Sequence, residues 1–298
     1  MEISASRYSS KYSFAVTGAS YIGAPRSNTA MFVTKKVGTL IQALQGVEDC
    51  LVFAEEGLEV PEELVKKHCF VFSTNPQCDY ARFTESFFGE EERTNSSIGY
   101  EVLSNGAHIS KSASIGSNAV IEPEVVIGPG VVIGNNARIY AGAIVKNAII
   151  GNNVIINEHA VIGANGFTMA NDEEGNKIRI YSLGKVQIGN DVEIGAHDNV
   201  SRGSGGNTII EDSVKIDALV HVGHDAHLHK NVEITAGAVI GGFVDAKEGA
   251  YVGINAVIRN RVVLGNNCFI GMGATVTKTV ENGITVVGNP AKPFEKKQ

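Results

Sequence analysis

The densest group of titratable side chains lies between residues 221 and 229. Four of the eight histidines fall there, in the run His221-Val-Gly-His224-Asp225-Ala-His227-Leu-His229. An imidazole, with a pKa near about 6.5, can take a proton from an attacking amine or hydroxyl close to neutral pH. It is also the commonest metal ligand in proteins. The residue types therefore indicate either a general base or a metal site, and their spacing has to decide between them.

The segment that carries these histidines repeats every six residues. From Ile210 to Val276 an aliphatic residue or alanine occupies twelve successive positions, each six residues after the last. That period cannot keep one face of an α-helix, and six-residue units with Gly or Asn after the aliphatic position are typical of a parallel β-helix. Three units of six residues close a triangular coil of 18, so residues 18 apart share an edge of neighbouring coils.

This arithmetic places His224 beside a pair of glycines. If Val222 points inward, His224 lies at the next corner and faces outward, and 224 + 18 gives Gly242, which follows Gly241. A backbone N–H with no side chain beside it can stabilise an oxyanion, and removing one such donor raises a reaction barrier by about 3 kcal/mol. A base at His224 and an oxyanion donor at Gly242 predict acyl transfer. We expect Asp225 to point elsewhere, and to reach an imidazole only across a corner or from a neighbouring subunit.

The spacing is less favourable for a metal site. Steps of three, three and two residues between the four histidines do not repeat at 18, so the rings are not expected to stack on one edge. A trimer could still bring them together between subunits. We therefore expect no bound metal, and keep metal binding as an alternative.

The chain before residue 101 lacks the six-residue repeat. Its alternation of β-rich runs and helical patterns predicts a small α/β domain over residues 1–100. The expected strands are 13–16, 30–34, 50–54 and 69–73, the expected helices are 38–47, 61–68 and 76–88, and the expected linker is 89–97.

Residues 101–276 are expected to form the β-helix, with interruptions. An insertion at about 163–187 contains the polar segment 171–179, which should leave the prism as a loop, and a second, smaller insertion covers 202–207. Residues 277–298 are expected to cap the last coil, because an uncovered strand edge invites aggregation.

Composition excludes several partners. The net charge of −7 comes without a basic block, which argues against nucleic acid binding. We find no apolar run of about 18 residues and no secretory leader, so we expect neither a membrane span nor export. The four cysteines have no metal-type spacing, and reduced thiols in a cytoplasmic protein are the preferred interpretation.

Several motifs together resemble one known family. Asn165-Gly166-Phe167, Ser201-Arg-Gly203 and His221-Val-Gly-His224-Asp225 followed by Gly241-Gly242 resemble the UDP-3-O-acylglucosamine N-acyltransferases of lipid A synthesis. The resemblance implies a left-handed β-helix and a homotrimer with active sites between subunits. It also implies a general-base histidine at His224 and a backbone oxyanion donor at Gly242.

The resemblance extends, more faintly, to residues outside this pair. It suggests that Phe32 stacks on the nucleotide base and that the family's second active-site histidine is replaced by Arg261. The family's usual Asp before Arg-Gly is Ser201 here, and the helical extension that contacts acyl carrier protein is missing. Beyond His224 and Gly242, we expect the following residues to contact substrate: Phe32, Asn165, Phe167, His221, Asp225 and Arg261.

The ending of the chain favours a different acyl donor. Residues 286–292, Val-Val-Gly-Asn-Pro-Ala-Lys, look like those of coenzyme A-dependent acetyltransferases that modify nucleotide-linked amino sugars. We therefore expect an N-acyltransferase that acylates the amine of a nucleotide-activated amino sugar, for lipid A or a surface polysaccharide. We expect no bound cofactor, with acyl-CoA as cosubstrate in preference to acyl-ACP.

Three alternatives stay open. One is a UDP-3-O-(3-hydroxyacyl)glucosamine N-acyltransferase that uses acyl-ACP, with acyl carrier protein as its partner. A second is a metal-dependent enzyme on the same prism, like the γ-carbonic anhydrases. A third is a non-catalytic nucleotide-sugar-binding protein, since the second histidine is absent.

Overall fold

The computed structural model describes residues 1–294 and divides them into two compact units. The first unit comprises residues 1–97, 166–184 and 204–206, and the second comprises the rest of the described chain. Residues 295–298, which belong to the predicted C-terminal cap, lie outside the described part.

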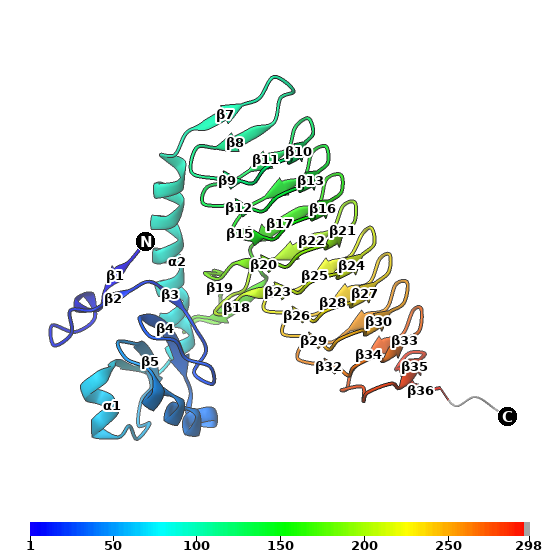
Figure 1. The fold of residues 1–298 in the computed structure, drawn as a ribbon. Coiled ribbons are helices and arrows are strands. Elements are labelled where there is room, and N and C mark those ends of the chain that lie inside the picture. The colour runs from blue at the N-terminus through cyan, green and yellow to red at the C-terminus, as the bar shows by residue number, and fades with distance from the viewer. Residues whose placement is uncertain (295–298) are drawn as a thin grey trace. The chain divides into compact units, whose positions relative to one another are not determined.

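The second unit is a parallel β-helix whose strands stack into three sheets, here called faces 1, 2 and 3 (Figure 1). Face 1 consists of β8 (His108–Ser110), β11 (Val126–Ile127), β14 (Ile144–Val145), β17 (Val161–Ala164), β22 (Asn199–Ser201), β25 (His221–Val222), β28 (Val239–Ile240), β31 (Val257–Ile258) and β34 (Thr275–Val276), with β7 (Tyr100–Val102) antiparallel at its start. Face 2 consists of β9 (Ser114–Ile115), β12 (Val132–Ile133), β15 (Ala148–Ile150), β20 (Val186–Ile188), β23 (Thr208–Ile210), β26 (His227–Leu228), β29 (Asp245–Ala246) and β32 (Val263–Leu264). Face 3 consists of β10 (Val120–Ile121), β13 (Arg138–Ile139), β16 (Ile155–Ile156), β21 (Glu193–Ile194), β24 (Lys215–Ile216), β27 (Glu233–Ile234), β30 (Tyr251–Val252), β33 (Phe269–Ile270), β35 (Thr285–Val287) and β36 (Lys292–Pro293).

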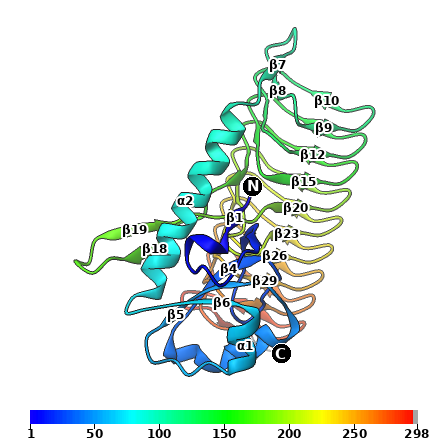
Figure 2. The ribbon, with the colours of Figure 1, turned by 90° about the vertical axis from the view of Figure 1, so that its left-hand side faces the viewer.

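The strand register confirms the 18-residue coil. On face 1 Val222 pairs with Ile240, and Ile240 pairs with Ile258. These inward aliphatic residues form one continuous buried core along the unit. The corners confirm the predicted left-handed backbone as well, because every sixth residue from Ser213 to Gly273 has a positive φ. Figure 2 shows the successive coils from the side.

The tail of the chain continues face 3. Strand β35 pairs in parallel with β33, and β36 folds back on β35 in antiparallel fashion. The described part of the predicted cap therefore covers the last strand of that face with a short hairpin, which is one way to protect an exposed edge.

The first unit is the predicted α/β domain. Its parallel sheet has the order β3 (Gly18–Ala19), β4 (Thr29–Val33), β5 (Leu51–Glu55) and β6 (Cys69–Ser73). A two-stranded antiparallel sheet of β1 (Ile3–Ser4) and β2 (Ala15–Val16) and a short 3-10 helix, η1 (Ala5–Arg7), precede it. The expected helices appear as 3-10 turns, η2 (Lys35–Gly46), and as two α-helices, α1 (Glu62–Lys67) and α2 (Pro76–Ser96).

The expected linker at 89–97 is wrong, because α2 runs through nearly all of it to Ser96. The helix begins with Pro76 in its first turn and with the Asn75 side chain accepting a hydrogen bond from the Cys78 N–H. Glutamates at 90–92 are good helix formers, so a single glycine at 89 does not end the helix. Charge and polarity alone are thus poor markers of a linker.

The polar insertion is also more ordered than expected. Residues 171–179 belong to an antiparallel hairpin, β18 (Thr168–Asn171) and β19 (Lys177–Ile180), rather than to a loop. Ala170 and Ile180 are buried in the same core cluster as Phe83 and Phe87 of α2. The alternating pattern of the hairpin gives it one apolar side, which packs on the helix.

Two further findings concern the chain's class. Within residues 1–294, no helix is both long and apolar enough to cross a membrane. All four cysteines are buried and unbridged, and burial raises the pKa of each thiol, to about 12 for Cys50 and about 11 for Cys69 and Cys268.

Candidate active site

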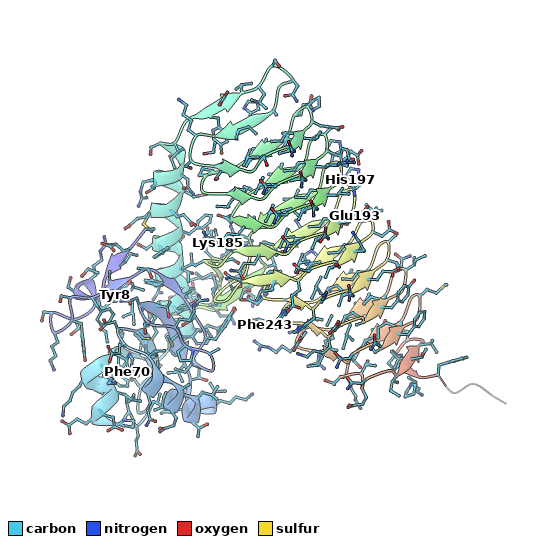
Figure 3. The ribbon with its side chains drawn as sticks, in the orientation of Figure 1. Tyr8, Phe70, Lys185, Glu193, His197 and Phe243 are labelled. Atoms are coloured by element: carbon cyan, nitrogen blue, oxygen red, sulfur yellow. The ribbon has the colours of Figure 1, made fainter. Side chains whose placement is uncertain are left out.

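The histidine predicted as a base lies at the corner between faces 1 and 2. His224 and Asp225 follow β25, Gly242 and Phe243 occupy the same corner one coil later, and Arg261 occupies the next. Backbone hydrogen bonds tie the three coils together: Phe243 N–H donates to the His224 carbonyl at 3.0 Å, and Arg261 N–H donates to the Gly242 carbonyl at 3.0 Å. Figure 3 labels Phe243 on this part of the unit. The chain therefore has His224 and Gly242 on one edge, as the spacing predicts.

The imidazole of His224 lies directly against the bare backbone of Gly242. A Cβ atom at position 242 would lie 3.0 Å from His224 Nε2 and 3.1 Å from His224 Cε1, closer than side chains normally pack. Gly242 does not have the left-handed φ that favours glycine. The missing side chain is therefore required by the space that the ring occupies, not by the backbone conformation.

Asp225 does not point away, as the sequence suggested, but bonds to His224 within the same chain. Its Oδ2 lies 2.9 Å from His224 Nδ1, and the two side chains are 5% and 18% exposed. The expectation failed because Asp225 has a φ of 58°, which turns its side chain back toward the preceding residue. A carboxylate on Nδ1 favours the tautomer with the proton on that nitrogen, which leaves the lone pair on Nε2, the atom beside Gly242.

A buried threonine holds the backbone of the aspartate. The Asp225 N–H donates to Thr208 Oγ1 at 2.9 Å, and Thr208 is fully buried. The contact joins β23 to the corner that carries the base. It was missed because the insertion at 202–207 displaces Thr208 from the 18-residue spacing.

An aromatic ring and a guanidinium extend the site along the same edge. The Phe243 ring meets the His224 ring edge-on, with centroids 5.2 Å apart and planes at 83°. The Arg261 guanidinium carbon lies 4.1 Å above the Phe243 ring, within the range of a cation–π contact. Phe243 was missed as a site residue, although 261 − 18 = 243 could have found it. A guanidinium stays protonated, so Arg261 can bind an anion but cannot act as a general base.

The backbone of this edge is costlier than that of the other two. Asp225, Phe243 and Arg261 have φ values of 58°, 60° and 64°, a conformation that costs a residue with a side chain roughly 1–2 kcal/mol. In the same coils, the equivalent positions on the other edges are glycine or asparagine, except for Ser213 and Leu219. Strained residues gathered on one edge indicate a functional constraint there.

His221 lies on the strand that leads into the site. Its side chain is exposed by surface area, yet surrounding protein atoms desolvate the ring, and this lowers its pKa, with a smaller contribution from the nearby His224. The neutral form is therefore favoured. On face 1 it pairs with Val239, whose side chain is partly exposed, so the surface beyond the base is apolar.

The remaining predicted contact residues are more scattered. Asn165 follows β17, which is two strands before β25 on face 1. Phe32 and Phe167 belong to the first unit, where Phe32 packs 5.3 Å from the Tyr80 ring and Phe167 is 80% exposed beneath the Arg179 guanidinium. Their contacts with substrate stay predictions.

Comparison with known proteins agrees with this architecture. Residues 207–242 and 247–278 match the bacterial transferase hexapeptide family, which has six repeats, and residues 103–168 match the GMPPB C-terminal domain. A UDP-N-acetylglucosamine acyltransferase structure from Francisella novicida is 27% identical, with a TM-score of 0.58, over 63% of this chain and 68% of that one. The predicted left-handed β-helix of hexapeptide repeats is confirmed by these likenesses.

The sequence relatives are acyltransferases by name. A UDP-3-O-acylglucosamine N-acyltransferase from Delftia acidovorans is 37% identical over 120 residues, and one from Caulobacter sp. K31 is 37% identical over 134. The matches cover 40% and 45% of this chain and 35% and 39% of the relatives. The chain thus matches little more than a third of the length of these relatives. It is a hexapeptide-repeat protein homologous to the UDP-3-O-acylglucosamine N-acyltransferases.

Proposed function

We propose that the protein is an N-acyltransferase that transfers an acyl group from a thioester to the amine of a nucleotide-activated amino sugar. The observation that carries the proposal is the contact between His224 Nε2 and the bare backbone of Gly242, with Asp225 bonded to the opposite ring nitrogen. A base and an oxyanion donor on one edge are the two groups that direct acyl transfer to an amine needs.

The reaction follows from the two ring nitrogens. Nε2 of His224 takes a proton from the amine as its nitrogen attacks the thioester carbonyl, and the carbonyl oxygen becomes an oxyanion that the Gly242 N–H stabilises. Collapse of this intermediate breaks the C–S bond, and the imidazolium returns the proton to the departing thiolate. Asp225 stabilises the imidazolium through Nδ1 in the meantime. The product is an amide, and no covalent acyl-enzyme forms.

The names of the relatives and neighbours support a nucleotide-sugar acceptor, since all of the cited proteins are named for UDP-glucosamine derivatives. We place Phe32, Asn165, Phe167, His221 and Arg261 around that acceptor, with Arg261 positioned for a negatively charged group. We further propose a cytoplasmic homotrimer whose active sites lie between subunits. The product serves lipid A or a surface polysaccharide.

For the donor we favour a short acyl-CoA, on the resemblance of residues 286–292 to coenzyme A-dependent enzymes. The relatives' names favour a second candidate, a UDP-3-O-acylglucosamine N-acyltransferase that uses an acyl carrier protein.

A thiol-release assay tests both candidates. Purified protein is incubated with UDP- or dTDP-linked amino sugars and with acetyl-CoA, longer acyl-CoAs or acyl-ACP, and the free thiol is measured. Acetyl-CoA turnover that depends on a free sugar amine supports the first candidate, and turnover with hydroxyacyl-ACP alone supports the second. Thiol release with no pair in the panel would argue for the non-catalytic alternative.

A further inference from the structure

A second cluster of titratable side chains lies on face 2, apart from the proposed catalytic groups. His227 Nε2 lies 2.6 Å from Glu211 Oε1, and His229 Nδ1 lies 3.2 Å from the same oxygen. One ligand atom from each of these three half-buried residues lies within 4.8 Å of the others. Glu211 and His229 are 18 residues apart, so the ladder itself brings them together.

From this geometry we propose that Glu211, His227 and His229 form a binding site for one Zn²⁺ ion per chain. Two imidazole nitrogens and one carboxylate oxygen are a donor set that zinc favours, with a fourth position left for water. With metal–ligand bonds of about 2.0 Å, ligand atoms at tetrahedral corners lie about 3.3 Å apart. The contact from Glu211 to His229 already has this spacing, and the contact from Glu211 to His227 has to lengthen.

The surroundings of His229 require a cation beside it. Both ring nitrogens face carboxylate oxygens, Glu211 Oε1 at 3.2 Å and Asp245 Oδ1 at 2.9 Å. A neutral imidazole has only one N–H, so one of these contacts needs either a second proton or a metal ion. The His227 and His229 rings are stacked with centroids 3.7 Å apart, and protonating both would bring like charges face to face. A single metal ion on both rings avoids that repulsion.

The groups behind the ligands are arranged to support an ion. Asp245 accepts a hydrogen bond at His229 Nε2, which leaves Nδ1 as the metal-binding nitrogen, and the Lys230 N–H donates to Glu211 Oε2 at 3.1 Å. Carboxylates and backbone groups behind histidine and glutamate ligands are usual in zinc sites. Lys247 Nζ bonds Asp245 Oδ2 at 2.6 Å and neutralises one of the two carboxylates, so one negative charge remains for the ion.

Solvent can reach the ligands from one side. A surface groove of about 420 Å³ on face 2 is lined by Glu211 and Lys230, with Gln187 and Ile209 among its other walls. The groove gives an ion a route to the Glu211 carboxylate. The sequence did not predict this site, because it considered only steps between histidines and not the glutamate one coil earlier.

Calorimetric titration of ZnCl₂ into chelator-treated full-length protein tests the proposal. We expect roughly one equivalent to bind, and expect His227→Gln and His229→Gln to abolish the saturable uptake. Asp245→Asn should weaken binding by about tenfold or more. The matched control is His197→Asn, which removes a ring from the other stacked histidine pair, His159 and His197, whose centroids are 5.2 Å apart; asparagine suits the φ of 60° at that position.

Two results would overturn the proposal. One is no saturable zinc uptake by the wild-type protein, and the other is unchanged uptake in both glutamine variants. If those variants do not fold, zinc-edge X-ray absorption of the zinc-loaded wild-type protein decides. Two imidazole ligands with the remaining ligands oxygen support the site, and a sulfur-bound or all-oxygen ion contradicts it. None of these measurements depends on acyltransferase activity.

Discussion

Replacing Gly242 by alanine should damage catalysis far more than stability. The new Cβ would lie 3.0 Å from His224 Nε2, 3.1 Å from Cε1 and 3.2 Å from the His224 carbonyl oxygen. Ordinary contacts of a Cβ begin at about 3.4 Å, so the imidazole has to move by a few tenths of an ångström or more. That movement strains the 2.9 Å bond to Asp225 and places a methyl group where the reacting carbonyl should lie.

The size of the effect follows from these contacts. Misplacement of a catalytic group by about 1 Å can cost roughly 100-fold in rate, which corresponds to about 2.7 kcal/mol of barrier. We therefore expect kcat/KM of Gly242→Ala to fall by about 10- to 100-fold. The free energy of unfolding should change little, because position 242 does not have a left-handed φ.

The assay is thiol release by the purified variant, with urea unfolding measured in parallel. Gly128→Ala is the matched control, since it lies on face 1 four strands before the site and its Cβ would approach neighbours no closer than 3.4 Å. A folded Gly242→Ala enzyme with wild-type kcat/KM would refute the reasoning, because the ring could not then be working against this backbone.

Three further changes probe the corners and a buried carboxyl. Leu219→Asn should raise the free energy of unfolding by up to about 1 kcal/mol with unchanged turnover, because Leu219 is 65% exposed at a φ of 62°; lower stability in urea would contradict this. Arg261→Asn, the same exchange on the site edge, should leave stability nearly unchanged, since relief of strain offsets the lost contact with Phe243. Its KM for the nucleotide sugar should rise, and an unchanged KM would remove Arg261 from the acceptor site. Burial raises the pKa of Asp198 to about 7, although Gly195 and Val220 N–H groups donate to it. The folded protein thus binds this proton more tightly than the unfolded chain, and stability should fall by up to about 4 kcal/mol as pH rises from about 4 to 7. Asp198→Asn should lose that slope in urea titrations across the range, and a slope that survives would assign it to another group.

The repeat made much of the β-helix predictable. Val222, Ile240 and Ile258 recur at 18 residues because each inward side chain must pack on the one below, and this fixes register and edge together. The neighbourhood of His224 and Gly242 followed from the same arithmetic.

What the arithmetic could not give was side-chain direction. Asp225 turns toward His224 only because its φ is positive, and a residue's backbone conformation at a corner is not visible in the spacing. Thr208 was hidden by the insertion before it, which breaks the count. Glu211 and His229 obeyed the count, but only a search that included carboxylates would have paired them.

In the α/β unit, polarity misled the prediction at two places. The acidic run at 90–92 extends α2, and the polar segment 171–179 forms a hairpin whose apolar side includes Ile180. In both cases the local propensity or alternation outweighed overall hydrophilicity.

The most direct test of the account is kcat/KM of His224→Asn, measured by thiol release with the donor and sugar that the wild-type protein uses, on a variant whose oligomeric state is unchanged. Loss of a general base predicts a fall of about 100-fold or more. Turnover close to that of the wild-type protein would show that another group takes the proton and that the corner shared by His224 and Gly242 is not the catalytic centre.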